Sequence, residues 1–243
     1  MNKTARDYIV FPLDVASAGE AEELVRLLDG HVGMFKIGLE LFIDQGPSVI
    51  RMVRDLSRAG IFLDLKLHDI SATVGRAMER VAGLGVDLVT VHAGGSFQML
   101  EAAVQGGMGK TGVLGVTLLT DNDSESVEAA GFKEEFIREP RKLVELRARM
   151  ARRAGCAGVV CSGREARMIK QEFGKDFLCV TPGIRPQWSL LEKDDQKRVT
   201  TPARAVSVGS DLLVIGRPIR DADDPAGAAQ KVIAEIQEAL SKA

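Results

Sequence analysis

The chain has 243 residues with 32 Lys and Arg against 34 Asp and Glu, so its formal net charge of −2 argues against nucleic acid as a partner. Hydrophobic residues make up 45% and charged residues 27%, which is typical of a globular protein with an ample core. No apolar run approaches the roughly 18 residues of a membrane span, and the first residues contain no signal-peptide core. We therefore expect a cytoplasmic protein with no membrane partner.

Short apolar or β-branched runs alternate with segments of helical spacing along the whole chain. The runs predict eight strands, at residues 8–13, 34–37, 61–65, 88–91, 112–118, 157–160, 177–180 and 212–215. The helical segments lie at residues 18–28, 47–58, 74–84, 96–105, 141–154, 163–173, 202–206 and 225–243. Nearly continuous apolar strands are typical of a parallel sheet covered by helices. The pattern predicts an α/β protein, a single (β/α)₈ TIM barrel over residues 1–243.

Two connections are much longer than the others. Residues 119–140 are acidic and polar with short helical patches, whereas residues 183–201 are almost all polar and lack any period. A long loop without regular structure inside a compact domain usually has a function. We expect the second connection to be a lid loop after the seventh strand.

Charged residues lie at the predicted ends of the first three strands, where TIM barrels carry their functional groups. Asp14 follows the first strand and Lys36 lies in the second. In the third, alternation puts Asp64 and Lys66 on one side of the strand and the leucines on the other. A structural salt bridge is the alternative interpretation. The extra carboxylate of Asp69 favours a reaction centre, because carboxylates beside lysines shift pKa values or aim the ammonium group.

The loops after the seventh and eighth strands carry a second pattern, Thr-Pro-Gly-Ile-Arg-Pro at residues 181–186 and Ile-Gly-Arg-Pro at residues 215–218. These loops form the usual phosphate site of TIM barrels, where glycines let backbone N–H groups approach an anion. The guanidinium group of Arg217 suits phosphate oxygens. Ordinary turn chemistry of Pro and Gly is the alternative explanation.

Histidines and cysteines give no sign of a metal centre. The three histidines are too few and too scattered, and the cysteines are odd in number with no Cys-x-x-Cys spacing. We expect no metal site. The cysteines, Cys156, Cys161 and Cys179, are predicted to be buried small hydrophobic residues.

The run DLKLHDI at residues 64–70, joined to Asp14 and Lys36, resembles the signature of the orotidine 5′-phosphate decarboxylase family. Six further segments follow in the family's order, at residues 35–38, 116–120, 160–162, 181–186, 195–198 and 215–219. One such motif would be weak, whereas six in register across most of the chain are strong.

The resemblance implies a homodimeric TIM barrel that converts orotidine 5′-monophosphate to UMP and CO₂, the last step of de novo UMP biosynthesis, without cofactor or metal. It implies that Lys66 gives a proton to the carbon that loses CO₂, and that Lys36 and Asp64 complete the charged network. Asp69 and Thr73 would reach across the dimer interface into the neighbouring site.

The resemblance also implies the contacts with the rest of the nucleotide. Asp14 would bind the ribose hydroxyls and Thr120 the pyrimidine. The other implied substrate-binding residues, mostly at the phosphate end, are Pro182, Arg185, Gln196, Gly216 and Arg217. The chain departs from the family's usual Ile-Pro-Asn-Thr in having Ile-Ser-Ala-Thr at residues 70–73, which keeps Thr73 in register. Trp188 and extra lid residues make Gln187 a rival for the Gln196 contact.

The chemistry agrees with this assignment. Loss of CO₂ from a ring carbon without an electron sink leaves a localised carbanion, which a protein without a cofactor stabilises only by electrostatics and positioning. One alternative is a related sugar-phosphate decarboxylase or synthase that uses a metal; the Thr120 loop, the lid and the lysine-rich centre favour the nucleotide. The other is a non-catalytic barrel that binds a nucleotide phosphate, which has no need for so many charges.

Overall fold

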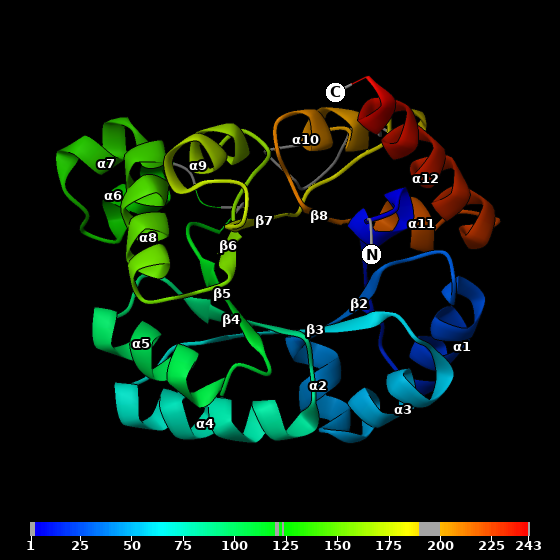
Figure 1. Ribbon diagram of the computed structural model, residues 1–243, viewed down its shortest axis with the longest axis horizontal. Coiled ribbons are helices and arrows are strands. Elements are labelled where there is room, and N and C mark those ends of the chain that lie inside the picture. Colours follow the sequence, from blue (N-terminus) through cyan, green and yellow to red (C-terminus); the bar gives the residue numbers. More distant parts are fainter. Residues whose placement is uncertain (1–2, 120–121, 123, 190–199, 243) are drawn as a thin grey trace.

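Eight parallel strands close into a barrel in the computed structural model, which describes residues 3–119, 122, 124–189 and 200–242 (Figure 1). Each strand pairs with its neighbour in sequence, and the last pairs with the first. The strands are β1 (Ile9–Pro12), β2 (Met34–Gly38), β3 (Gly60–Leu67), β4 (Leu88–His92), β5 (Gly112–Val116), β6 (Gly158–Val160), β7 (Leu178–Thr181) and β8 (Leu212–Val214). The predicted TIM barrel is confirmed, with all eight strands in their predicted places.

Helices surround the barrel (Figure 1), and α4 packs beside α5. Eight of them match predicted segments: α1 (Ala18–Leu28), α3 (Ser48–Leu56), α4 (Ser71–Leu84), α5 (Phe97–Gly106), α8 (Pro140–Arg153), α9 (Ala166–Phe173), α10 (Pro202–Ser207) and α12 (Pro225–Ser241). The short elements that were not given bounds in advance are η1 (Ala5–Tyr8), α2 (Leu39–Gln45), α6 (Ser124–Ala129), α7 (Glu134–Arg138), η2 (Gln187–Ser189) and α11 (Arg217–Arg220). The short helices α6 and α7 confirm the helical patches expected in residues 119–140. Most of the predicted lid, residues 190–199, lies outside the described residues.

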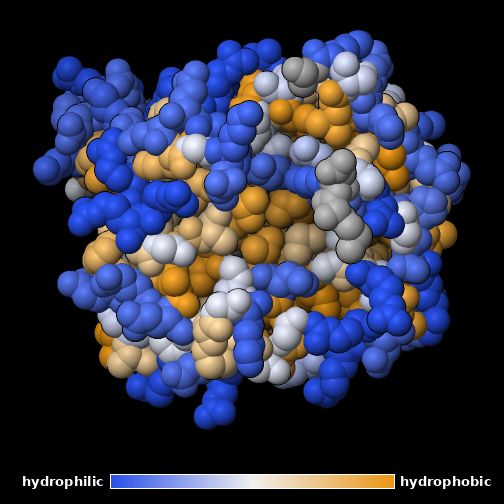
Figure 2. All heavy atoms as spheres, viewed as in Figure 1, coloured by the Kyte–Doolittle hydropathy of each residue, from blue (hydrophilic) through white to orange (hydrophobic). Residues whose placement is uncertain are grey.

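Buried apolar residues form two layers. The larger one fills the space between the barrel and its helices and includes all three cysteines, as predicted. The smaller one plugs the barrel interior with Val10, Met34, Phe62, Leu88, Leu114, Val180 and Leu212. Figure 2 shows apolar residues at the centre of the face and hydrophilic ones around it.

The interior layer identifies the residues that point into the barrel next to it, towards the carboxyl ends of the strands. Because side chains alternate, the residue two positions after each plug residue also points inward, one level closer to the carboxyl ends of the strands. Met34 is thus followed by Lys36, Phe62 by Asp64, and Leu88 by Thr90. On β2, β3 and β4 the barrel interior therefore changes from an apolar layer to a polar one within one step along the strand.

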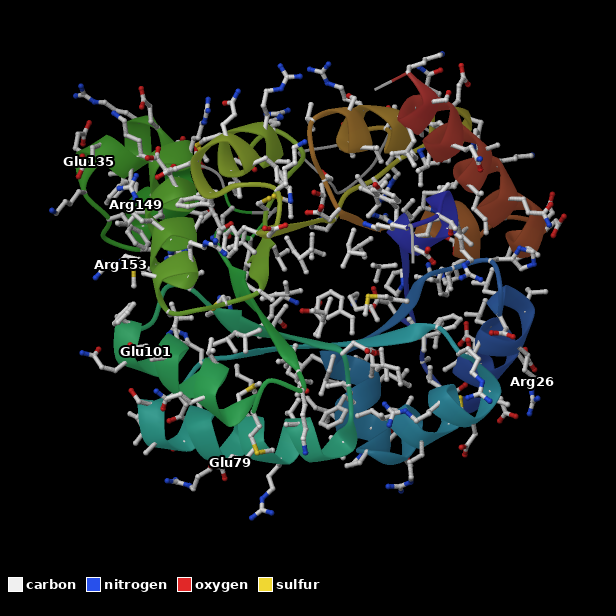
Figure 3. All side chains as sticks on the ribbon, viewed as in Figure 1. Arg26, Glu79, Glu101, Glu135, Arg149 and Arg153 are labelled. Carbon is white, nitrogen blue, oxygen red and sulfur yellow. The ribbon has the colours of Figure 1, made fainter. Side chains whose placement is uncertain are left out.

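Charged side chains elsewhere point outward from the surrounding helices. Figure 3 labels six of them, Arg26, Glu79, Glu101, Glu135, Arg149 and Arg153. Among the helices that the structure describes, none is both long and apolar enough to cross a membrane.

Candidate active site

Four charged residues form a chain of alternating sign at the carboxyl ends of β1 to β3. Lys36 Nζ lies 3.0 Å from Asp14 Oδ1 and 3.5 Å from Asp64 Oδ2. Lys66 Nζ lies 2.9 Å from the same oxygen of Asp64. The side chains of Lys36 and Asp64 are only 11% and 13% exposed, so these ions depend on one another for the solvation that burial removes. The structure thus brings together four of the residues that the sequence singled out.

Asp64 is the centre of this array, and its pKa shows the balance of forces. Burial by itself would raise the pKa of the Asp64 carboxyl group. The charges of Lys36 and Lys66, with hydrogen bonds from Lys66 and Thr90, together outweigh burial and hold that pKa below its usual value. Asp64 is therefore ionised at neutral pH and forms an ion pair with each lysine.

Asp64→Asn should lower the free energy of unfolding at pH 7 by about 3 kcal/mol, because the buried Lys36 ammonium group and the partly exposed Lys66 ammonium group lose the carboxylate between them. Since the pKa of Asp64 is lower in the folded protein than in the unfolded chain, its stabilising contribution is present above the unfolded value and is lost as the pH falls through the folded value. Urea unfolding of both proteins should give a constant difference from pH 8 to about pH 5 and a shrinking one below. Asp55→Asn, on the exposed side of α3, serves as the control. If the free energies of unfolding of wild type and Asp64→Asn differed by the same amount at every pH down to acid unfolding, this account would be wrong.

Two residues at the site gave no signal in the sequence. Thr90 in β4 donates a hydrogen bond to Asp64 Oδ1 at 2.8 Å and looked like an ordinary β-former in a buried strand. Arg220 in α11 donates to the backbone oxygen of Asp14 at 2.9 Å and pairs with Asp221 at 2.6 Å. Only the alternation along β4 could have found Thr90, since it puts that residue on the inner face with Leu88.

A cavity of about 360 Å³ joins the charged array to the loops after β7 and β8. It is lined by Pro12, Asp14, Lys36, Asp64, Pro182, Gly183, Arg185, Val214, Gly216, Arg217 and Arg220. Seven of the eleven are residues that the sequence predicted for the site. The cavity therefore connects the array to two predicted phosphate-binding arginines.

The arginine end of the cavity owes its shape to glycine and to a buried guanidinium group. A Cβ atom on Gly216 would lie 3.0 Å from Pro12 Cγ, so this position has little room for a side chain. Arg185 is buried, and its Nη1 donates to the backbone oxygen of Ile184 at 3.0 Å. Arg217 lies in the first turn of α11, is exposed, and lines the same cavity. Two guanidinium groups lining one cavity provide donors for the oxygens of a phosphate group.

The other end of the site is apolar. A cavity of about 160 Å³ is lined by Lys36, Phe62, Asp64, Lys66, Val116, Leu118, Leu119, Val160, Cys161, Val180, Pro182 and Val214. Only three of these side chains carry charge, so the Lys66 ammonium group borders a pocket of low polarity. Electrostatic interactions are stronger in such surroundings than in water.

The remaining predicted residues lie away from these cavities or outside the described chain. Asp69 is exposed beyond β3, where its Oδ1 accepts from the Ile70 backbone N–H at 2.6 Å, and Thr73 is half-buried in the first turn of α4. Neither lines the cavities just described. Gln187 is exposed in η2 and does not line them either. Thr120 and Gln196 lie outside the described residues.

This arrangement defines a class of protein: a TIM-barrel enzyme with a phosphate-type pocket beside a reaction centre of alternating ammonium and carboxylate groups. The chain belongs to the orotidine 5′-phosphate decarboxylase / HUMPS family, whose model matches residues 7–232.

Named relatives cover nearly the full chain. It is 50% identical to the orotidine 5′-phosphate decarboxylase of Desulfosudis oleivorans over 240 residues, 98% of this chain and 96% of that one. It is 43% identical to the one of Geobacter metallireducens, over 96% of this chain and 97% of that one. The crystal structure of orotidine 5′-phosphate decarboxylase from Lactobacillus acidophilus matches with a TM-score of 0.79 and 34% identity, over 94% of this chain and 98% of that one.

Proposed function

We propose that this protein decarboxylates orotidine 5′-monophosphate to UMP and CO₂, the last step of de novo UMP biosynthesis. The observation that carries the proposal is the chain of Asp14, Lys36, Asp64 and Lys66 beside a cavity lined by Arg185 and Arg217, the two arginines predicted to bind phosphate. Relatives that are 41% to 50% identical over at least 94% of this chain bear the name of that enzyme. A biosynthetic enzyme acting on a free nucleotide is expected in the cytoplasm.

Family membership alone leaves the sugar-phosphate barrels as an alternative, because the HUMPS proteins share the family. The surroundings of Asp64 favour the nucleotide reaction. Its Oδ2 already contacts two ammonium groups, at 2.9 and 3.5 Å, and its Oδ1 accepts from Thr90. A metal cation at this carboxylate would have to approach two positive charges, which opposes its binding.

Lys66 is suited to the chemical step. When the bond between the ring carbon and the carboxylate breaks, CO₂ leaves and the electron pair stays on that carbon. The Lys66 ammonium group stabilises this negative charge and then transfers a proton to the carbon, which gives UMP; the neutral lysine regains a proton from water. The ammonium interacts more strongly with the developing carbanion than with the starting ring, and this difference lowers the barrier.

The other residues hold the nucleotide in place. Asp14 accepts hydrogen bonds from the ribose hydroxyls, and Arg185 and Arg217 bind the phosphate beside Gly216. We assign Thr120 to the pyrimidine and Gln196 to the phosphate. Because the phosphate is remote from the reacting carbon, its binding energy can position the ring and exclude water from it.

The proposed enzyme is a homodimer in which Asp69 and Thr73 enter the partner's site. The apolar surface near these residues supports this assembly. Leu39, Ile43 and Ile70 are 53%, 74% and 71% exposed, on α2 and on the loop after β3. These segments follow adjacent strands, so a second copy of the chain can cover both at once.

The test is an assay of UMP formation from orotidine 5′-monophosphate in the presence of EDTA. We expect stoichiometric UMP and CO₂ at an unchanged rate. Activity that EDTA removes and Mg²⁺ restores would point to the metal-using alternative, and nucleotide binding without turnover would point to a binding protein.

Arg217→Ala should raise KM for the nucleotide by about 10- to 100-fold, because charge-assisted hydrogen bonds to the phosphate are lost. The phosphate-free nucleoside provides the comparison: its slow turnover should barely change. Arg26→Ala, on the outer surface of α1, is the control and should leave both substrates unaffected. Equal losses on nucleotide and nucleoside would make Arg217 a structural residue instead.

A further inference from the structure

Thr90 contacts both Asp64 and Lys66 from the neighbouring strand. Its side chain is completely buried in β4, and its hydroxyl donates to Asp64 Oδ1 at 2.8 Å. The hydroxyl oxygen of Thr90 also accepts a hydrogen bond from the backbone N–H of Lys66 at 2.9 Å. One hydroxyl group thus uses its donor on the carboxylate and its acceptor on the lysine backbone.

The backbone of β3 explains why this contact is needed. The ladder between β3 and β4 is regular at Phe62 and Leu63, then shifts register and resumes at Leu67. Lys66 lies inside this shift with a φ of +51°, in the left-handed region that residues other than glycine rarely adopt. In a regular ladder a carbonyl oxygen of β4 would accept from such an N–H; here the Thr90 hydroxyl does so.

The two hydrogen bonds of Thr90 hold Asp64 and the backbone of Lys66 in place. Asp64 has Oδ2 on the lysines and Oδ1 on Thr90, so the plane of its carboxylate is set. The Lys66 side chain leaves a backbone held by the same hydroxyl and ends 2.9 Å from that carboxylate. Thr90 itself lines neither of the two cavities, which separates its role from substrate contact.

We propose that Thr90 is a positioning residue, which holds the unusual backbone of Lys66 and the carboxylate of Asp64 in the geometry that proton transfer requires. The inference rests on the proposed decarboxylation. It goes further by proposing that the buried Thr90 hydroxyl on β4 sets the orientation of Lys66.

Thr90→Val keeps the shape of the side chain and removes the hydroxyl. We expect kcat to fall by about 100-fold, since small displacements of a reacting group have effects of that size. KM should change little, because the proposed ribose and phosphate contacts come from the ends of β1, β7 and β8. Thr90→Ser retains the hydroxyl and should restore kcat to within about fivefold of wild type.

Thr111→Val is the matched control. Thr111 is also buried, and its hydroxyl donates to the backbone oxygen of Val86 at 2.8 Å, next to the start of β5 and remote from the carboxyl ends of the strands. Thr111→Val should lower the thermal midpoint in the same way as Thr90→Val and leave kcat unchanged. If both variants lose stability but only Thr90→Val loses kcat, the loss of kcat comes from positioning and not from destabilisation.

Wild-type turnover is measured first, so that failure of the proposed function is seen before any variant is compared. With an active wild type, a Thr90→Val enzyme whose kcat stays within about twofold of wild type overturns the inference, as does a Thr90→Ser enzyme no better than Thr90→Val. If Thr90→Val does not fold, Thr90→Cys takes its place, because its thiol is a weak donor and acceptor; wild-type kcat in that variant overturns the inference equally.

Discussion

Lys66→Ala should fold, bind UMP and lose at least about 10⁴-fold in kcat, because the change removes the proposed proton donor together with the charge proposed to stabilise the carbanion. UMP carries no carboxylate at the reacting carbon, and its proposed phosphate and ribose contacts are with Asp14, Arg185 and Arg217, which line the larger cavity. Steady-state UMP formation and calorimetric binding of UMP measure the two effects separately.

Two further variants make this result specific. Lys66→Arg keeps a positive charge but gives up a proton far less readily, so it should recover little activity. Lys142→Ala removes a surface lysine of α8 that lies 2.9 Å from Glu139, and should behave as wild type. If Lys66→Ala kept even a tenth of wild-type activity, Lys66 would not be the proton donor.

The barrel could be predicted because each of its units repeats the same local pattern. Apolar strands of period two and amphipathic helices are encoded by neighbouring residues, so their order was enough to predict eight strand–helix units. Helix α2 was not predicted because it begins at Leu39, directly after β2, and exposes Leu39 and Ile43, so it has no continuous buried face. Helix α11 spans only residues Arg217–Arg220, which is too short for any periodicity.

The charged part of the site was predictable for the same reason, whereas its supports were not. Alternation along β3 puts Asp64 and Lys66 on one face, and the structure brings them within 2.9 Å. The left-handed backbone conformation of Lys66 could not be predicted, because that position holds a lysine and not a glycine. Thr90 contacts Asp64, 26 residues away in sequence, because β3 pairs with β4, and Arg220 contacts Asp14, 206 residues away, because the barrel closes between β8 and β1.

Asp69 differs from the other proposed site residues, because its proposed role requires a second copy of the chain. It lies three residues beyond Lys66, past the end of β3, and it lines neither of the two cavities described above. If it completes the neighbouring site, Asp69→Ala should be nearly inactive although the cavities of its own chain are unchanged.

Mixing two inactive variants tests this arrangement. In a dimer of one Lys66→Ala and one Asp69→Ala protomer, one site lacks both residues and the other has both. After equal amounts are mixed and re-equilibrated, half of the dimers are mixed and half of their sites are whole, so activity should return to roughly a quarter of wild type per site. Lys66→Ala mixed with itself gives the background. No recovery, with subunit exchange demonstrated by mass spectrometry, would mean that Asp69 serves its own chain and that the proposed shared site is wrong.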